Sequence, residues 1–144
     1  MPKQRISKSD KLWVAARANH HCEYCRCLKS YVPGPFGIDH ILPESKGGGS
    51  DLENLAYACD GCNGHKYQKT EAIDPLTSLS ARLFHPRTDK WKEHFRWSSD
   101  FLKIEGITPE GRATIAALQL NRVELINYRT ALKTINKHPP KETL

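Results

Sequence analysis

The chain has 144 residues, of which 38% are hydrophobic and 26% are charged, and no apolar run in it is long enough to cross a bilayer. This length allows one ordinary domain, or a small metal-stabilised unit with an extension, and it excludes two large hydrophobic cores. The formal net charge of +6 fits either a protein that binds nucleic acid or one with many solvated lysines.

The N-terminal segment indicates the compartment. It is basic but lacks the apolar stretch of a secretory signal. We therefore expect a cytoplasmic protein with no membrane partner. Cysteines in that reducing compartment are rarely disulfides, so their spacing is better explained by metal binding or catalysis.

The charges are unevenly distributed along the chain. Residues 1–30 carry seven Lys and Arg against two Asp and Glu, residues 31–75 carry three against seven, and residues 76–144 carry twelve against seven. Basic flanks suit a polyanion such as DNA, and an acidic centre suits a divalent cation. The pattern favours a nuclease over a plain DNA-binding module.

A short helix is predicted near the N-terminus. Ser9 is a residue type that caps helices, and it precedes a run in which Leu12, Trp13 and Ala16 can share one face. The central part then predicts two strands followed by a helix.

Residues 38–42 (IDHIL) and 55–59 (LAYAC) are the two strand-like stretches, separated by Pro43 and a glycine-rich loop. The helix is expected from about Asn63 to Ala72. The order strand, strand, helix is thus predicted for the acidic centre of the chain.

Two further helices are predicted in residues 76–144. Thr108 with Pro109 at the first helical position opens one of them, and Asn121 with Glu124 forms a start resembling a capping box for the other. Basic and aromatic side chains alternate before these helices, and they could follow a DNA backbone and stack on bases, or pack between helices. They are Arg82, Arg87, Lys90, Lys92 and Arg96 with Trp91, Phe95 and Trp97.

Four cysteines form two pairs with metal-binding spacing. Cys22 and Cys25 make one C-x-x-C pair, Cys59 and Cys62 make the other, and 33 residues lie between the pairs. Two such pairs complete the tetrahedral shell of a structural zinc, which leaves no open position for substrate. Cys27 offers an alternative pairing with Cys25, but C-x-C spacing is less usual in structural zinc sites, so Cys27 is interpreted as an ordinary small side chain.

A second set of residues lies between and just after the cysteine pairs. Asp39-His40-Ile41-Leu42-Pro43 is followed by a glycine loop, by Asn54-Leu55, and by the run Cys59-Asp60-Gly61-Cys62-Asn63-Gly64-His65-Lys66. Together these motifs resemble the HNH, or ββα-metal, endonuclease family, in its standalone bacterial or phage type with a four-cysteine zinc site. The resemblance covers about residues 20 to 70 and depends on several independent matches.

The resemblance implies a role for each matching residue. His40 matches the general base that takes a proton from the attacking water, and Asn54 matches the asparagine that bonds the loop backbone and orients that base. Asp39 and Asn63 match the ligands of a catalytic Mg²⁺ or Mn²⁺. Adjacent strand residues point to opposite faces, so Asp39 and His40 can serve one site only if the strand ends or bends there.

Two residues of the predicted helix are candidates for binding substrate. Lys66 lies three positions after Asn63 and shares its helix face, where it can contact phosphate. His65 points away from that face, so it is less suited than Asn63 to bind the cation and is expected to contact substrate or to be exposed.

The resemblance predicts an α+β fold: a small ββα-metal nuclease unit with a structural zinc, preceded by a short helix and followed by a mixed C-terminal extension with two helices. Residues 1–75 are assigned to the nuclease unit. Residues 76–144 are assigned to the extension, which packs on that unit or contacts DNA.

The implied activity is metal-dependent hydrolysis of DNA, leaving 5′-phosphate and 3′-hydroxyl ends. One such site cuts one strand, so cutting both requires a homodimer or two visits. The alternatives are a non-catalytic zinc-containing DNA-binding module and a nuclease that acts on RNA. The adjacent carboxylate and imidazole of Asp39 and His40 favour the enzyme, because a binding module needs neither.

Overall fold

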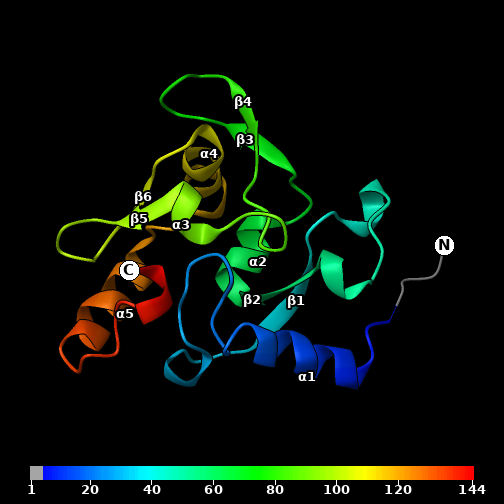
Figure 1. Cartoon of the computed structure of the whole chain (residues 1–144), viewed down its shortest axis with the longest axis horizontal. Coiled ribbons are helices and arrows are strands. Elements are labelled where there is room, and N and C mark those ends of the chain that lie inside the picture. Colours follow the sequence, from blue (N-terminus) through cyan, green and yellow to red (C-terminus); the bar gives the residue numbers. More distant parts are fainter. Residues whose placement is uncertain (1–4) are drawn as a thin grey trace. The chain divides into compact units, whose positions relative to one another are not determined.

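The computed structural model describes residues 5–144, coloured along the chain in Figure 1, and the chain divides into two compact units. The N-terminal unit contains the described residues up to Thr70, together with His85–Thr88, and the C-terminal unit contains Glu71–Phe84 and Asp89–Leu144. The first four residues of the expected unit 1–75 lie outside the described residues. Within residues 5–144, the helices are too short and too polar to cross a membrane.

The predicted N-terminal helix is present as α1 (Lys8–Arg17), but its cap differs from the prediction. Ser7, which has an extended backbone, is the cap, and its Oγ accepts a hydrogen bond of 3.1 Å from the backbone N–H of Asp10. The prediction of Ser9 as the cap was wrong because Ser9 already lies within the first turn. Both serines precede the apolar run, and the sequence does not distinguish between them.

The buried face of α1 also differs from the prediction. Val14 is fully buried and packs in a core with Leu55 and Tyr57, whereas Leu12 is 64% and Trp13 is 56% exposed. The side chains predicted to form the apolar face therefore lie on the outer surface of the helix. The smaller Val14 fits against the strands, and burying a valine contributes roughly 1.5–3 kcal/mol to stability.

Two strands and a helix follow, as predicted. Strands β1 (Phe36–His40) and β2 (Leu55–Cys59) pair antiparallel in a register that runs from Phe36 opposite Cys59 to His40 opposite Leu55. Helix α2 (Asp60–Lys66) starts directly after β2. The predicted ββα order is confirmed.

The bounds predicted for α2 were wrong at both ends. The helix begins at Asp60 because Cys59 caps it, its Sγ accepting from the backbone N–H of Cys62 at 3.4 Å. It ends at Lys66 because Tyr67 adopts φ 49° and ψ −117°, which no helix can continue. Ala72 lies in a strand instead.

The C-terminal unit contains two small antiparallel sheets and three helices. These elements are β3 (Glu71–Ile73) with β4 (Ser80–Arg82), β5 (Phe95–Trp97) with β6 (Ile104–Gly106), α3 (Trp91–His94), α4 (Pro109–Leu118) and α5 (Val123–Lys133). Helix α4 starts as predicted, with the Oγ1 of Thr108 accepting from the N–H of Gly111 at 3.0 Å. The α+β fold class is confirmed.

The start of α5 was predicted only in part. The helix exists, but Arg122 precedes its first residue and makes no side-chain cap hydrogen bond. The predicted cap, Asn121, instead bonds both backbone groups of Ile104, accepting from its N–H at 2.8 Å and donating to its C=O at 2.9 Å. The Asn121 amide therefore holds the first residue of β6, which lies 17 residues away in sequence.

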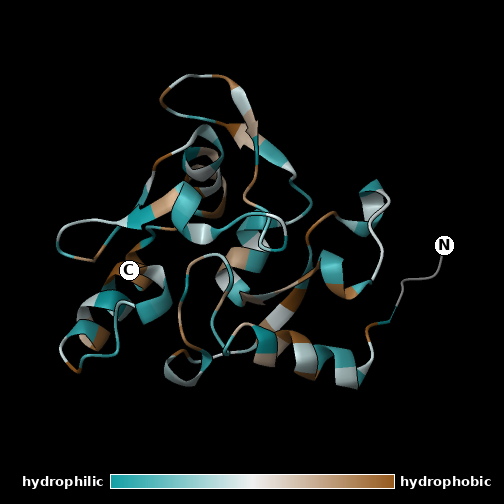
Figure 2. Cartoon of the chain, in the orientation of Figure 1, coloured by the Kyte–Doolittle hydropathy of each residue, from teal (hydrophilic) through white to brown (hydrophobic). Residues whose placement is uncertain are grey.

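The aromatic residues of the C-terminal unit form its core. Trp91, Phe95 and Trp97 are buried, with ring centroids 5.2 Å apart for Trp91 and Phe95 and 5.4 Å apart for Trp91 and Trp97. Of the two interpretations of these rings, packing is the one observed. Leu76 and Leu79, on the loop between β3 and β4, are exposed. Figure 2 shows how hydrophobic and hydrophilic residues are distributed along the chain.

A partly buried ion pair anchors that same loop. The carboxylate of Asp74 accepts from Nε and Nη2 of Arg112 on α4, at 2.9 Å each, and from the backbone N–H of Leu76 and the hydroxyl of Thr77, at 3.0 Å each. These donors, Arg112 first among them, hold the pKa of Asp74 well below its usual range.

This depressed pKa predicts an acid-dependent contribution to stability. The contribution is present above the unfolded-state pKa near 3.8 and is lost as the pH falls through the lower folded-state value. Asp74→Asn should therefore lower the thermal midpoint at pH 7, and its difference from the wild type should shrink at pH 2.5. The control is Asp51→Asn, at an exposed carboxylate. A difference for Asp74→Asn that stays constant with pH would contradict the prediction.

Candidate functional site

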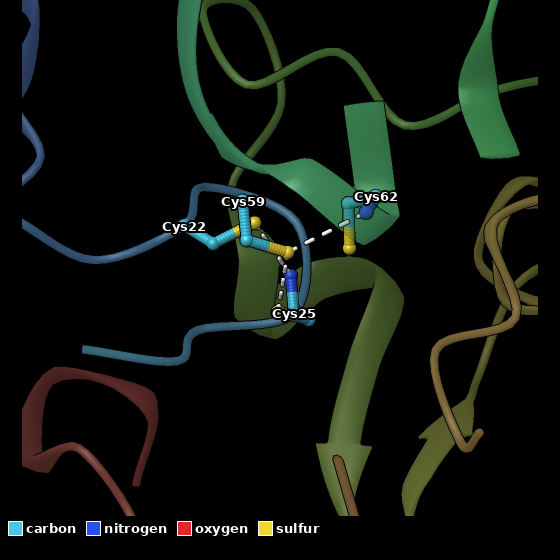
Figure 3. Close-up of side chains that lie close together, drawn as sticks. All are labelled: Cys22, Cys25, Cys59 and Cys62. Atoms are coloured by element: carbon cyan, nitrogen blue, oxygen red, sulfur yellow. Dashed lines mark hydrogen bonds between the residues drawn. The ribbon is translucent and has the colours of Figure 1, made fainter. Parts of the chain in front are cut away.

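The four paired cysteines converge on one point in the N-terminal unit. The Sγ atoms of Cys22, Cys25, Cys59 and Cys62 are buried and all lie within 4.8 Å of one another (Figure 3). A tetrahedral zinc with Zn–S bonds of about 2.3 Å separates its sulfurs by about 3.8 Å, and the Sγ atoms of Cys25 and Cys59 are 3.7 Å apart. The donor set and its spacing fit zinc.

The backbone around each pair favours this convergence. The N–H of Cys25 points to Sγ of Cys22 at 3.5 Å, just as the N–H of Cys62 points to Sγ of Cys59. Arg26 turns the first pair with a left-handed φ of 68°. Burial raises the pKa of the Cys22 thiol, and a zinc ion, when bound, would stabilise its thiolate form.

The fifth cysteine lies beside the cluster. Cys27 is buried, and its Sγ is 3.4 Å from that of Cys25. Its backbone C=O accepts a 2.8 Å hydrogen bond from the N–H of Cys22, which closes the turn that carries the first pair. The group of four sulfurs that can hold one ion is nevertheless the predicted one, with Cys22 rather than Cys27.

His40 is the last residue of β1. Its Nε2 lies 3.0 Å from the hydroxyl of Ser50 and 3.4 Å from Oε1 of Glu44. The ring is therefore held between a hydroxyl and a carboxylate, at the point where the chain leaves the strand.

Asp39, the preceding residue, is buried with two donors. Its Oδ2 accepts from the hydroxyl of Tyr24 at 2.6 Å, and Nζ of Lys66 lies 3.2 Å from Oδ1 and 3.1 Å from Oδ2. Burial raises the pKa of Asp39, while the charge of Lys66 opposes that rise. Burial and the neighbouring carboxylate also raise the pKa of Tyr24 well above its usual value, so its hydroxyl is a donor.

Lys66 does not lie where a phosphate contact would need it. The sequence predicts an accessible ammonium, but Lys66 is only 1% exposed. Besides Asp39, its Nζ donates to the backbone C=O of Ile41 at 3.0 Å and of His40 at 3.3 Å. Lys66 thus neutralises the buried carboxylate and holds the chain where β1 ends.

Asn54 fixes the loop that follows. Its Oδ1 accepts from the N–H of Leu42 at 2.8 Å, and its Nδ2 donates to the C=O of Leu42 at 3.0 Å and of Gly49 at 2.7 Å. Gly48 is required in this loop, because a Cβ there would lie 1.7 Å from the carbonyl oxygen of Leu42. The loop between the strands is consequently tied to the end of β1.

A pocket of about 360 Å³ brings three of the predicted residues together. Its lining residues are Ile38, Asp39, His40, Pro43, Glu44, Ser45, Asn63, Tyr67 and Gln68. Asn63 enters from α2, where its amide lies against Gly37 of β1. Carboxylate and amide oxygens of this kind suit Mg²⁺ or Mn²⁺. His65 is exposed and lies outside this lining.

The pocket can include both Asp39 and His40 because the strand stops at His40. The next residue, Ile41, donates its N–H to the C=O of Asn54 at 2.9 Å, beyond the last strand pair. The chain then bends at Ile41 and Leu42, directly after the strand.

Three neighbours of the site were not identified from the sequence: Tyr24, Glu44 and Ser50. Tyr24 lies inside the first cysteine pair, which is the only local signal that it is near the metal centre. Glu44 follows His40 by four residues, and Ser50 closes the glycine loop. Their contacts depend on how that loop folds.

A comparison with protein-family models gives a match for this region. The model of HNH endonucleases matches residues 22–69, one third of the chain, from the first cysteine to just beyond α2. The four cysteines fit the zinc-containing type of that domain. No curated protein and no solved structure gave a match.

The cluster predicts which cysteines hold the metal. The purified chain should contain one zinc, Cys27→Ala should keep it, and Cys22→Ala should lose it, because only Cys22 belongs to the group of four sulfurs. Elemental analysis of the purified variants measures this. Zinc retained by Cys22→Ala and lost by Cys27→Ala would reverse the ligand assignment.

The position of Lys66 predicts a role in stability. Lys66→Ala leaves the Asp39 carboxylate buried without its cation, so it should lower the free energy of unfolding by about 3–5 kcal/mol. Urea unfolding of zinc-loaded protein measures the change. Lys69→Ala is the matched control, because Lys69 is exposed and its Nζ donates to the C=O of His65. Equal stability of the two variants would instead favour an accessible, phosphate-binding Lys66.

Proposed function

We propose that the chain is an endonuclease that hydrolyses DNA phosphodiester bonds with a divalent cation, because the HNH endonuclease model matches residues 22–69 and four cysteines there are placed to hold a metal. The main support is the pocket that His40, Asp39 and Asn63 line together. It joins an imidazole to oxygen donors suited to a hard cation, the combination that phosphodiester hydrolysis needs.

His40 is proposed as the general base. A neutral imidazole near pH 7 can take a proton from water as that water attacks phosphorus. The contacts of Nε2 with Ser50 and Glu44 limit the rotation of the ring, and His40 and Glu44 both line the pocket. Asn54 supports this orientation through the loop backbone that it binds.

Asp39 and Asn63 are proposed to hold the catalytic cation. When bound, Mg²⁺ or Mn²⁺ stabilises the negative charge on the phosphate oxygens and on the departing O3′. The buried Asp39 contributes an oxygen whose place is fixed by Tyr24 and Lys66, and Asn63 contributes its amide from α2. The products would carry 5′-phosphate and 3′-hydroxyl ends.

Substrate contacts are proposed for the surface around this pocket. His65 is exposed on α2 and can contact the nucleic acid. Lys66 is reassigned from phosphate binding to holding Asp39, since its ammonium is already satisfied.

DNA is the proposed partner because of the domain family and the net positive charge. One such site cuts one strand, so double-strand cleavage would require a homodimer or two visits. A reducing cytoplasm would keep the five cysteines as thiols, which the zinc site requires.

Plasmid cleavage tests the proposal. Wild-type protein should cut with Mg²⁺ or Mn²⁺ and not with EDTA, and His40→Ala should cut roughly 10²–10⁴-fold more slowly at unchanged zinc content, because the base is lost. His20→Asn is the control, at an exposed histidine whose left-handed φ of 58° asparagine tolerates.

Equal cutting by wild type and His40→Ala would remove His40 from the mechanism. Cutting by neither, with tight DNA binding retained, would favour a non-catalytic zinc-containing DNA-binding module. Cutting of RNA alone would change the substrate class.

A further inference from the structure

The Asp39 carboxylate receives one donor from each cysteine pair. Tyr24 lies between Cys22 and Cys25, and its hydroxyl is 2.6 Å from Oδ2. Lys66 follows Cys62 by four residues, one turn along α2, and its Nζ reaches both carboxylate oxygens. The two segments that carry the cysteine pairs therefore converge at the cysteine cluster and also at the Asp39 carboxylate.

These three side chains form a buried group at the edge of the pocket that Asp39 lines. Tyr24 and Lys66 are each 1% exposed and Asp39 is 4% exposed. A buried carboxylate with two fixed donors keeps a single orientation, because rotation would break one of these hydrogen bonds. An oxygen ligand of a divalent cation needs such a fixed position.

The first cysteine pair is itself fastened to the strands. Glu23, beside Tyr24, accepts from the N–H of Tyr57 on β2 at 2.8 Å and forms an ion pair with Arg87. Its backbone N–H donates to the C=O of Tyr57 at 2.8 Å. The segment that carries Tyr24 is thus held by both the cysteine cluster and β2. The Tyr24 hydroxyl therefore has a fixed position from which it donates to Asp39.

We propose that Tyr24 is a positioning residue for the catalytic cation, through which the zinc site fixes the Asp39 carboxylate. This inference rests on the proposed function, since it takes Asp39 as a cation ligand. Tyr24 itself touches neither the cation nor the substrate.

The test is a titration of the zinc-loaded full-length chain with Mn²⁺. The electron paramagnetic resonance signal of free Mn²⁺ measures how much of the ion is bound. Tyr24→Phe removes only the hydroxyl, and it should keep one zinc while weakening Mn²⁺ binding by roughly tenfold or more, the usual effect of losing a hydrogen bond to a charged group. Tyr57→Phe is the matched control, a tyrosine of the same unit that packs on Phe36.

A double-mutant cycle separates positioning from a general effect on structure. In an Asp39→Asn background, Tyr24→Phe should cause no further loss of Mn²⁺ affinity, because the hydroxyl acts through the carboxylate. Asp39→Glu gives a second test that leaves both cysteine pairs unchanged. It keeps the charge but moves the carboxylate, and it should also weaken binding.

The outcomes are distinguishable. Unchanged Mn²⁺ affinity in zinc-loaded Tyr24→Phe, with wild-type binding that depends on Asp39, would overturn this inference and leave the proposed function standing. Wild-type affinity in Asp39→Glu would also overturn it. Absence of any Asp39-dependent Mn²⁺ binding in the wild type would overturn both.

Discussion

The burial of one carboxylate organises the candidate site. Removing the charge of Asp39 from water costs several kcal/mol, and only close donors offset that cost. Tyr24 and Lys66 are those donors, and each is carried by a segment that also carries two cysteines of the metal centre. The structure that gathers the thiols therefore also gathers the groups that make a buried carboxylate tolerable.

The N-terminal unit combines a cluster of four cysteines with a small apolar core. Its apolar core contains few residues, chiefly Val14, Ala18, Leu55 and Tyr57, and cores of this size rarely stabilise a fold alone. Four cysteines that converge on one point can replace the missing apolar contacts, since binding of the metal adds its free energy to folding. The C-terminal unit has a set of buried aromatic rings and shows no comparable group of ligands among its described residues.

The sequence is informative where a residue's role depends on near neighbours. The spacing of the cysteines, the ββα order and the cap at Thr108 are all local patterns, and the structure contains each of them. It is uninformative where the partner is distant. Lys66 meets Asp39 across 27 residues and Asn121 meets Ile104 across 17, so side chains typical of a surface or a helix cap hold strand ends instead.

The end of β1 decides what the pocket can do. On a continuing strand, Asp39 and His40 would face opposite sides of the sheet. The strand stops at His40 because Lys66 binds the carbonyls of His40 and Ile41, and because Asn54 holds Leu42 in the loop. Carboxylate and imidazole then border one pocket while each keeps its own hydrogen-bond partners. Substitutions in this loop should therefore change the relative positions of His40 and Asp39 without changing either residue. The turn after β1 thus sets the geometry of the proposed base and cation ligand.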